Sequence, residues 1–235
     1  VWPTPPLPLP SRPFLHRVLL VAGEKAVPHT LGYIDFAAKP EWLPQVNPAG
    51  SVPVAKDLST GAWIVDSAVI ADWLEEKWPQ PALGKTADSP AACVAVERAG
   101  ARARATPLPP TTTSLLSLRG SDVFPAFAAF LKAPPGDPEG KEAALVAALR
   151  SLCAHLSTRG PWLGGAALGQ ADCALAPKLH HMQVALRHFK GWEAPAECAA
   201  VGAYLDAWRA RPSWQAHAYT DAAIVAGWKR HMEHA

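Results

Sequence analysis

The sequence predicts a small α/β domain followed by an all-helical domain. As far as Leu83, helical apolar periodicity alternates with short runs of strand character, which is typical of a mixed α/β unit. From Asp122 onward the apolar residues follow the helical period alone. These patterns divide the chain into an irregular Pro-rich segment over 1–12, an α/β domain over 13–84 and an all-helical domain over 85–235.

The α/β domain should open with a helix over 13–26, because Phe14, Val18 and Val21 share one face and Pro13 suits a first helical turn. The remaining elements follow from alternation, turn residues and the positions of the prolines. They are a strand over 29–36, a short helix or turn over 39–46, a hairpin of strands over 51–57 and 62–65, and a helix over 67–78.

The second domain should contain a series of amphipathic helices. The apolar period predicts them over 122–132, 141–158, 170–188, 197–211 and 213–227. Proline and glycine clusters separate the first three helices from one another. Gly169 with Asp172 three residues later resembles a capping box, with Gly in the place of the usual Ser or Thr.

Two stretches do not fit this scheme. Half of the first ten residues are proline, so this segment should be polyproline-like or irregular. Residues 97–120 form an irregular loop of unusual length, rich in Arg, Ala, Pro, Thr, Ser and Leu. Because Pro, Leu and Ser have pyrimidine-rich codons, we interpret both stretches as translated intron. The first residue is valine, so the true N-terminus is expected to lie outside this sequence.

The composition excludes several classes of function. A net charge of +2 gives no argument for a nucleic-acid partner, and no apolar run approaches the roughly 20 residues of a membrane span. The cysteines form no C-x-x-C pair, which indicates a reducing compartment and neither a disulfide framework nor a zinc site. His180 and His181 point to different helix faces, so no metal site is expected.

The stretch from Asn47 to Ser67 is the best candidate for a binding site. Pro53 cannot donate to a sheet ladder, and a cis Val52–Pro53 bond would present the Val52 N–H and C=O to an extended ligand. Asp66 and Ser67 begin the next helix, where backbone N–H groups can receive a carboxylate. Together these features indicate half of a small-peptide site. An ordinary strand turn followed by an ordinary helix cap is the structural alternative.

Several short motifs recur along both domains. They are Pro13-Phe14-Leu15-His16-Arg17-Val18, Lys39-Pro40-Glu41-Trp42, Val46-Asn47-Pro48, Val52-Pro53-Val54, Asp66-Ser67, Gly160-Pro161-Trp162, Ala176-Pro177-Lys178-Leu179, Val184 to Lys190 and Ile224-Val225-Ala226-Gly227-Trp228. Through these motifs the chain resembles the glutathione-transferase superfamily, and plant-type dehydroascorbate reductases in particular, over residue 13 to about 92 and residues 121–228. The resemblance implies a thioredoxin-like N-terminal domain, an all-helical C-terminal domain and glutathione as co-substrate, with no bound cofactor.

The resemblance also implies roles for individual residues. It places glutathione against Phe14, Lys39, Val52, Pro53, Asp66 and Ser67, and the ascorbate side against His181 and Trp228. The structural alternatives are a solvated surface cation for Lys39, a core aromatic for Trp228 and a satisfied structural histidine for His181.

The sequence departs from these enzymes at the position that carries their chemistry. Their mechanism needs a cysteine directly before the Pro-Phe pair, where the helix N-terminus lowers the thiol pKa, and here that position is Arg12. Ser11 could instead hydrogen-bond a glutathione thiol, as in serine-type transferases. Cys173 is expected to be a buried small hydrophobe. The first strand is also expected to be missing, because the Pro-rich segment cannot pair within a sheet.

The sequence therefore favours a glutathione-dependent dehydroascorbate reductase, acting as a monomer in the cytoplasm or a plastid, whose chain lacks the catalytic thiol. A catalytically inactive glutathione-binding or interaction protein of the same fold, or a transferase using Ser11, are the alternatives. The chloride intracellular channel proteins share a similar first-helix motif, but the Ile224–Trp228 block argues against that family.

Overall fold

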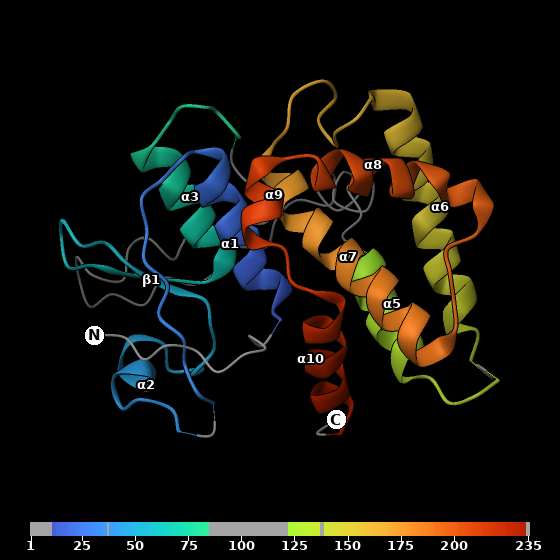
Figure 1. Cartoon of the computed structure of the whole chain (residues 1–235), viewed down its shortest axis with the longest axis horizontal. Coiled ribbons are helices and arrows are strands. Elements are labelled where there is room, and N and C mark those ends of the chain that lie inside the picture. The colour runs from blue at the N-terminus through green and yellow to red at the C-terminus, as the bar shows by residue number, and fades with distance from the viewer. Residues whose placement is uncertain (1–10, 37, 85–121, 137–138, 234–235) are drawn as a thin grey trace, which may run out of the picture.

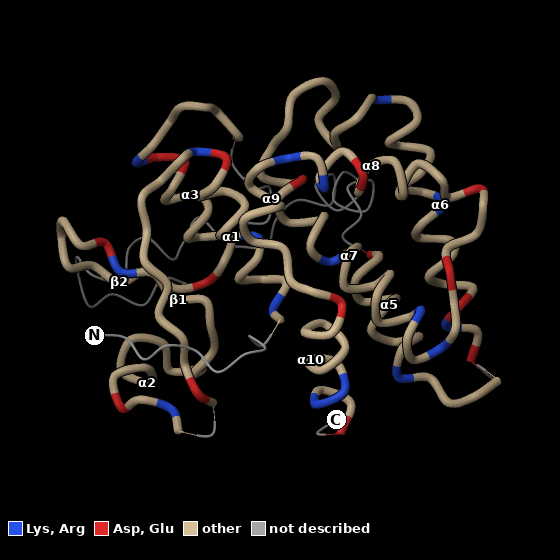
Figure 2. Tube along the Cα trace, in the orientation of Figure 1, with Lys and Arg blue, Asp and Glu red and all other residues tan. Residues whose placement is uncertain are grey.

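The computed structural model describes residues 11–36, 38–84, 122–136 and 139–233 (Figure 1). The predictions for 1–10 and for the loop over 97–120, including their origin in an intron, lie outside the described residues. Within these ranges an N-terminal unit with a small sheet packs against a larger set of helices (Figure 1). Figure 2 shows that positively and negatively charged residues are distributed over both parts.

The N-terminal unit contains most of the elements expected from the sequence. The structure confirms the first helix, the short helix, the hairpin and the helix that follows it, with somewhat shorter strands. The bounds are α1 Pro13–Glu24, α2 Trp42–Val46, β1 Val54–Lys56, β2 Trp63–Val65 and α3 Ser67–Lys77. β1 and β2 are antiparallel, with Val54 opposite Val65 and Lys56 opposite Trp63.

The strand predicted over 29–36 is wrong. The segment is extended, but it pairs with no strand among the described residues, whose sheet consists of β1 and β2. An extended segment becomes a strand only when a neighbour supplies a hydrogen-bonding ladder. Here a cavity separates the segment from β1, so its side chains have strand-like alternation without a partner.

The second unit is helical, as expected. Its elements are α5 Val123–Lys132, α6 Lys141–Arg159, α7 Gln170–Lys190, η2 Ala196–Cys198, α8 Ala199–Arg209, α9 Pro212–His217 and α10 Asp221–Glu233. The single helix predicted over 213–227 is wrong, because Ala218 has an extended backbone and divides it into α9 and α10. The hydroxyl of Thr220 then accepts from the Ala223 N–H at 3.3 Å and supports the new helix start.

The start of α7 confirms the expected cap. The Asp172 carboxylate accepts from the Gly169 N–H at 2.9 Å, and also from the Leu163 N–H at 2.8 Å. The Tyr204 hydroxyl donates to the same carboxylate at 3.2 Å. Burial raises the pKa of Asp172, against the opposing effect of these hydrogen bonds. The side chain therefore joins α7, α8 and the loop before α7.

α1 lies at the centre of the molecule and packs against α3, α7 and α9 (Figure 1). Its Leu20 and Val21 side chains are fully buried in this contact. At its end, Lys25 donates to the Trp78 and Pro81 carbonyls at 2.7 Å each and forms an ion pair with Glu75 at 2.7 Å. The last turn of α1 is thus fixed to the segment that follows α3.

Candidate functional site

The Val52 turn, residues 47–53, lies directly before β1. Its Val52–Pro53 peptide bond is cis. Among the residues that the structure describes, the Val52 N–H and C=O pair with no other backbone group. A Cβ built at Gly50 would stand 3.4 Å from Lys39 Nζ, so the lysine lies beside this turn. The turn therefore offers one free backbone donor, one free acceptor and a nearby cation.

The start of α3 is occupied in part by its own cap. The Asp66 carboxylate accepts from the Ala68 N–H at 2.7 Å and from the Val69 N–H at 3.3 Å. Because Asp66 caps its own helix, Ser67 is the residue at this helix start that remains available to a ligand carboxylate. Within the described ranges neither the N–H nor the hydroxyl of Ser67 has a partner, and its side chain is buried.

Replacing Asp66 by alanine should destabilise the N-terminal unit. The change removes the cap, which is worth about 0.5–2 kcal/mol. Chemical denaturation should therefore show a loss of that size in the free energy of unfolding. Leu58→Ala is the control, because Leu58 is 89% exposed and its loss should have little effect. Equal stabilities of Asp66→Ala and the control would contradict the capping role.

Arg12 is the N-cap of α1, as the sequence places it. Its backbone is extended and its side chain makes no capping hydrogen bond. The guanidinium lies over the Phe36 ring at 4.1 Å from the centroid, and burial lowers the pKa of Arg12. α1 has no acidic residue in its first turn. The N-terminus of α1 therefore carries an added positive charge, whereas the helix dipole favours a negative charge there.

A hydrogen-bonded chain connects three residues that the sequence singled out. Ser11 Oγ lies 2.8 Å from His181 Nε2, and Trp228 Nε1 lies 3.2 Å from His181 Nδ1. Indole N–H can only donate, so Nδ1 accepts and the proton of the neutral imidazole is on Nε2. His181 therefore donates to Ser11 Oγ, and the hydroxyl proton of Ser11 can point elsewhere.

His181 does not face an open site. It is 1% exposed, with both ring nitrogens hydrogen-bonded, and burial together with His180 lowers its pKa to about 3. Burial and these two hydrogen bonds are the features expected of a satisfied structural histidine, the second of the two interpretations of this residue. Trp228 is likewise buried and packs against Phe127, with ring centroids 4.9 Å apart.

Around the start of α1 the structure brings together side chains from α1, α5, α7 and the segment before α10, a grouping that the sequence did not indicate. Phe14 is 43% exposed and meets the edge of Phe124 on α5, with centroids 6.0 Å apart. Lys178 Nζ lies 5.7 Å from the centroids of both rings. Tyr219 lies close to Arg12, which lowers the pKa of the tyrosine. Burial has the larger, opposite effect and raises the pKa of Tyr219 to about 12. No sequence spacing relates α5 or Tyr219 to residue 14, because only the tertiary fold brings them together.

A second histidine lies behind this site. His16 is fully buried, with its ring 4.8 Å from that of Trp214 and 5.4 Å from that of Tyr219. Neither ring nitrogen has a hydrogen-bond partner in the described parts of the chain. Burial, and then the neighbouring His181, lowers the pKa of His16 to about 3. The fold therefore requires a neutral imidazole here.

Comparison with known families identifies both units. The family "Glutathione S-transferase, N-terminal domain" matches residues 11–77, and "Glutathione S-transferase, C-terminal domain" matches residues 139–211. This chain belongs to the glutathione S-transferase family. The match confirms the predicted transferase-like fold, with a thioredoxin-like N-terminal unit whose described sheet has two strands and a mostly helical second unit.

Relatives within the glutathione S-transferase family are similar over nearly the whole chain. The probable cytosolic glutathione S-transferase DHAR1 of Oryza sativa subsp. japonica is 38% identical over 92% of this chain and 88% of its own length. The probable chloroplastic DHAR2 of the same plant is 34% identical over 92% of this chain and 69% of its own length. The crystal structure of Chlamydomonas reinhardtii dehydroascorbate reductase superposes with a TM-score of 0.72, at 38% identity, over 95% of this chain and 92% of that one.

The described residues contain neither a cluster of metal-binding side chains nor a membrane-spanning helix. No group of three or more His, Cys, Asp or Glu side chains there could hold a metal ion. No helix among them has the length and apolar character that a membrane crossing requires.

Proposed function

We propose that this chain binds glutathione and belongs functionally with the dehydroascorbate reductases, for which glutathione is the co-substrate and dehydroascorbate the substrate. The relatives' names support this assignment, and their cytosolic and chloroplastic labels support a location in the cytosol or a plastid. The observation that carries the proposal is the unpaired Val52 backbone, flanked by Lys39 on one side and leading through β1 and β2 to Ser67.

Each part of glutathione has a chemical counterpart in this arrangement. The Val52 N–H and C=O match the backbone of the cysteinyl unit. The Ser67 N–H and hydroxyl, at the positive end of α3, match the carboxylate of the γ-glutamyl unit. Lys39 offers a cation to the glycyl carboxylate. Phe14 is exposed at the first turn of α1, and the family resemblance places glutathione against this position.

The chemical step needs a group that this sequence does not provide at the expected place. Reduction of dehydroascorbate to ascorbate consumes two electrons and two protons, which two glutathione molecules supply as they form glutathione disulfide. In the mechanism that the family resemblance implies, a thiolate at the helix start mediates this exchange. Arg12 cannot act as a nucleophile, and Cys173 is fully buried with a pKa raised well above its ordinary value by burial. The chain should therefore bind glutathione without turnover.

Calorimetric titration with glutathione tests the binding site. We expect one site per chain, with affinity reduced about tenfold in Ser67→Ala, because a hydrogen bond to a charged group is worth about 1.5 kcal/mol. Reduction of dehydroascorbate should stay at the uncatalysed rate. Ser151→Ala, on the exposed face of α6, is the matched control. Absence of binding in the folded protein, or turnover by the unaltered chain, would overturn the proposal.

A second candidate function follows from the hydrogen bond between Ser11 and His181. Because His181 donates to Ser11 Oγ, the hydroxyl proton of Ser11 is available to a glutathione thiolate bound at the start of α1. This arrangement suits conjugation of glutathione to an electrophile, in which the thiolate sulfur forms the new bond and the leaving group departs with its electron pair.

Conjugation to 1-chloro-2,4-dinitrobenzene separates this second function from the first. If Ser11 stabilises the thiolate, Ser11→Ala should lower kcat/KM about tenfold and move the pH at which the bound thiol ionises upward by about one unit. His181→Phe should shift the same pH profile in the same direction. Ser151→Ala should leave the rate and the profile unchanged. An identical profile in Ser11→Ala and the unaltered chain would exclude Ser11 from this role.

A further inference from the structure

Two histidine rings lie close together where the segment after α1 meets the end of α9. His29 follows α1 in the chain, and His217 is the last residue of α9. Their ring centroids are 5.7 Å apart, and the ring planes are tilted by 44° to each other. His29 is exposed and His217 is half-buried, so solvent reaches the pair. Two imidazoles, one from each unit, therefore meet at the surface.

The close packing of α9 against α1 fixes the position of His217. A Cβ built at Gly23 would stand 3.0 Å from Ser213 Cβ and 3.5 Å from His217 Cδ2. Any side chain at position 23 would therefore push α9 away from α1. Because glycine allows the two helices to approach this closely, His217 is held beside the segment that carries His29.

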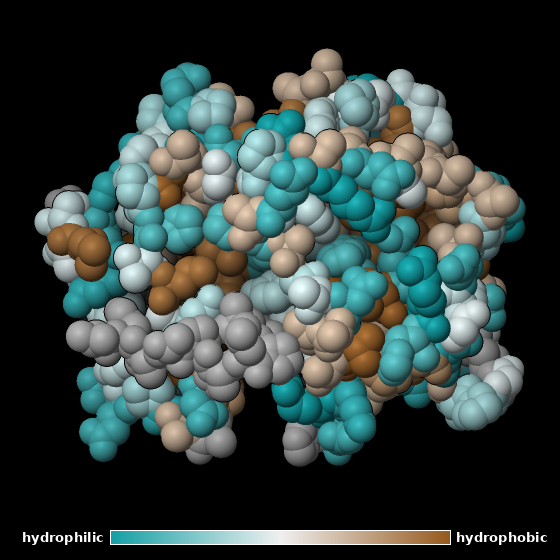
Figure 3. Space-filling view, viewed as in Figure 1, coloured by the Kyte–Doolittle hydropathy of each residue, from teal (hydrophilic) through white to brown (hydrophobic). Residues whose placement is uncertain are grey.

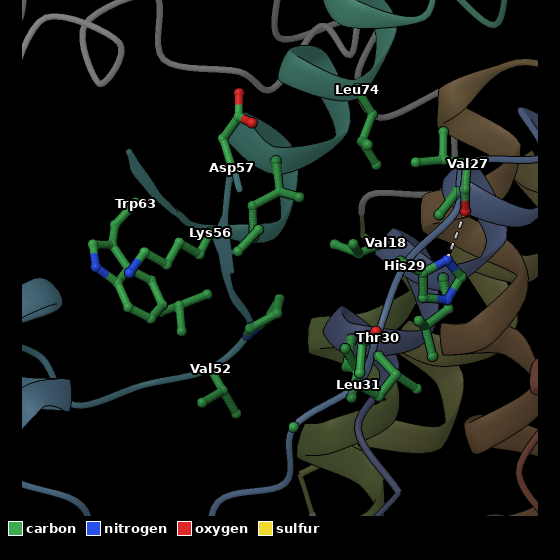
Figure 4. Close-up of a pocket in the computed structure, with 18 of the residues that line it drawn as sticks. Val18, Val27, His29, Thr30, Leu31, Val52, Lys56, Asp57, Trp63 and Leu74 are labelled. Carbon is green, nitrogen blue, oxygen red and sulfur yellow. Dashed lines mark hydrogen bonds between the residues drawn. The ribbon is translucent and has the colours of Figure 1, made fainter. Parts of the chain in front are cut away.

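A hydrogen bond fixes the tautomer of His29. Its Nδ1 lies 2.8 Å from the carbonyl oxygen of Val27, which the dashed line in Figure 4 marks. A carbonyl can only accept, so Nδ1 carries the proton and Nε2 carries the lone pair of the neutral ring. Histidines that ligate metals usually donate their other ring N–H to a carbonyl or a carboxylate in this way. His29 therefore has the form of a metal ligand that binds through Nε2.

His217 is also suited to the neutral form that a metal ion requires. Burial, and then the neighbouring His29, lowers the pKa of His217. A protonated imidazole has no lone pair to offer, so a lowered pKa favours metal binding near neutral pH.

The charged side chains around the pair are already balanced. Arg211, the N-cap of α9, forms an ion pair with Glu24, and Lys25 forms one with Glu75 at 2.7 Å. Ion pairing reduces the repulsion between these two cations and a bound metal ion. In the space-filling view, mainly hydrophilic and weakly hydrophobic residues cover α9, whereas the strongly hydrophobic area lies left of centre (Figure 3). Water can therefore reach an ion bound beside α9.

The separation of the two rings fits a single shared ion. Metal–nitrogen bonds of about 2.0 Å in a tetrahedral arrangement place two imidazole centroids about 5–6 Å apart. The observed separation of 5.7 Å lies in this range. Imidazole nitrogen suits Zn²⁺, Cu²⁺ and Ni²⁺, whereas Ca²⁺ and Mg²⁺ prefer oxygen ligands. Because the described residues form no metal-binding group of three or more, water has to supply the remaining ligands.

We propose that His29 and His217 together bind one divalent transition-metal ion, with water completing its coordination. The ion joins the segment after α1 to α9 and so connects the N-terminal unit to the helical unit. An ion that binds the folded chain and not the unfolded chain stabilises the fold, increasingly so as its concentration rises. The site shares no residue with the proposed glutathione site, so the two proposals are tested independently.

Titration of the full, tag-free chain with Cu²⁺ in a thiol-free buffer tests the proposal. Calorimetry should show one tightest site per chain, weakened at least tenfold in both His29→Ala and His217→Ala. Electron paramagnetic resonance should show hyperfine coupling to two imidazole nitrogens in the unaltered chain and to fewer in each variant. His188→Ala, at an exposed position of α7, is the matched control and should bind Cu²⁺ as the unaltered chain does.

Thermal unfolding gives a second measurement that does not depend on copper. Excess Zn²⁺ should raise the unfolding midpoint of the unaltered chain and of the control more than that of either variant. His217→Gln repeats the test should His217→Ala fail to fold.

Several outcomes would overturn the proposal. Two independent sites of equal affinity, or loss of binding in only one of the two variants, would show that the rings do not share an ion. Coupling to a single nitrogen in the unaltered chain would show the same. Unchanged Cu²⁺ affinity in both variants would assign the ion to other side chains.

Discussion

Replacing Arg12 by cysteine is expected to raise glutathione-dependent reduction of dehydroascorbate from the background rate by at least about a hundredfold, since positioned nucleophiles account for rate factors of this size or more. Position 12 is the N-cap of α1, where the unsatisfied N–H groups and the helix dipole stabilise a thiolate. The substitution also removes a positive charge from the N-terminus of α1. The introduced thiolate could attack the oxidised substrate and then be released by glutathione through a mixed disulfide.

The controls separate the gain of a thiol from the loss of arginine. Arg12→Ala and Arg12→Ser remove the same charge without adding a thiol, and both should stay at background. Ala210→Cys adds a thiol at an exposed position and should also stay there. Activity is followed by ascorbate absorbance with purified protein. A folded, glutathione-binding Arg12→Cys variant with no activity would show that the surrounding site, and not the missing thiol alone, prevents the reaction.

Acidification from pH 7 to pH 5 is expected to destabilise the protein by about 4 kcal/mol, through His16 and His181. Both rings are buried and neutral, and the pKa of each is lowered to about 3 in the folded state. In the unfolded chain the pKa returns to about 6.5, so the unfolded state binds more protons below that pH. Stability is therefore complete above about pH 6.5 and declines as the pH falls toward 3, by about 2 kcal/mol per histidine at pH 5.

Urea denaturation at the two pH values provides the measurement. His16→Phe should reduce the loss between pH 7 and pH 5 by about 2 kcal/mol, because it removes one of the two groups that the unfolded state protonates. His16→Leu repeats the test with a smaller side chain, in case phenylalanine is too large for the space between Trp214 and Tyr219. His188→Phe, at an exposed position of α7, should retain the full pH dependence. An unchanged pH dependence in both His16 variants would contradict the assignment.

The elements that the sequence predicted correctly depend on local patterns. α1 and α3 each combine an apolar face with a recognisable start, at Pro13 and Asp66. Segment 29–36 has strand-like alternation, but a strand also requires a partner, and alternation within one segment says nothing about a neighbour. The break before α10 was missed because the apolar period continues through Ala218, while the backbone turns there.

In the candidate site too, some features follow from local sequence patterns and others depend on the tertiary structure. Short motifs indicated Val52, Asp66 and Ser67, which are close together in sequence. The relation of Ser11 to His181 spans 170 residues and depends on the packing of α1 against α7, so no local spacing could reveal it. The self-capping of Asp66 was likewise hidden, because the same residue type can either cap its own helix or contact a ligand.

The central position of α1 has a consequence for the integrity of the protein. This helix precedes residue 84 in the chain, yet it shares buried surface with α7 and α9, which both follow residue 122. A single proteolytic cut between 84 and 122 would therefore leave two fragments held together by apolar contact and by the Glu24–Arg211 ion pair. Such a nicked protein would migrate as two bands under denaturing conditions and as one particle in native buffer.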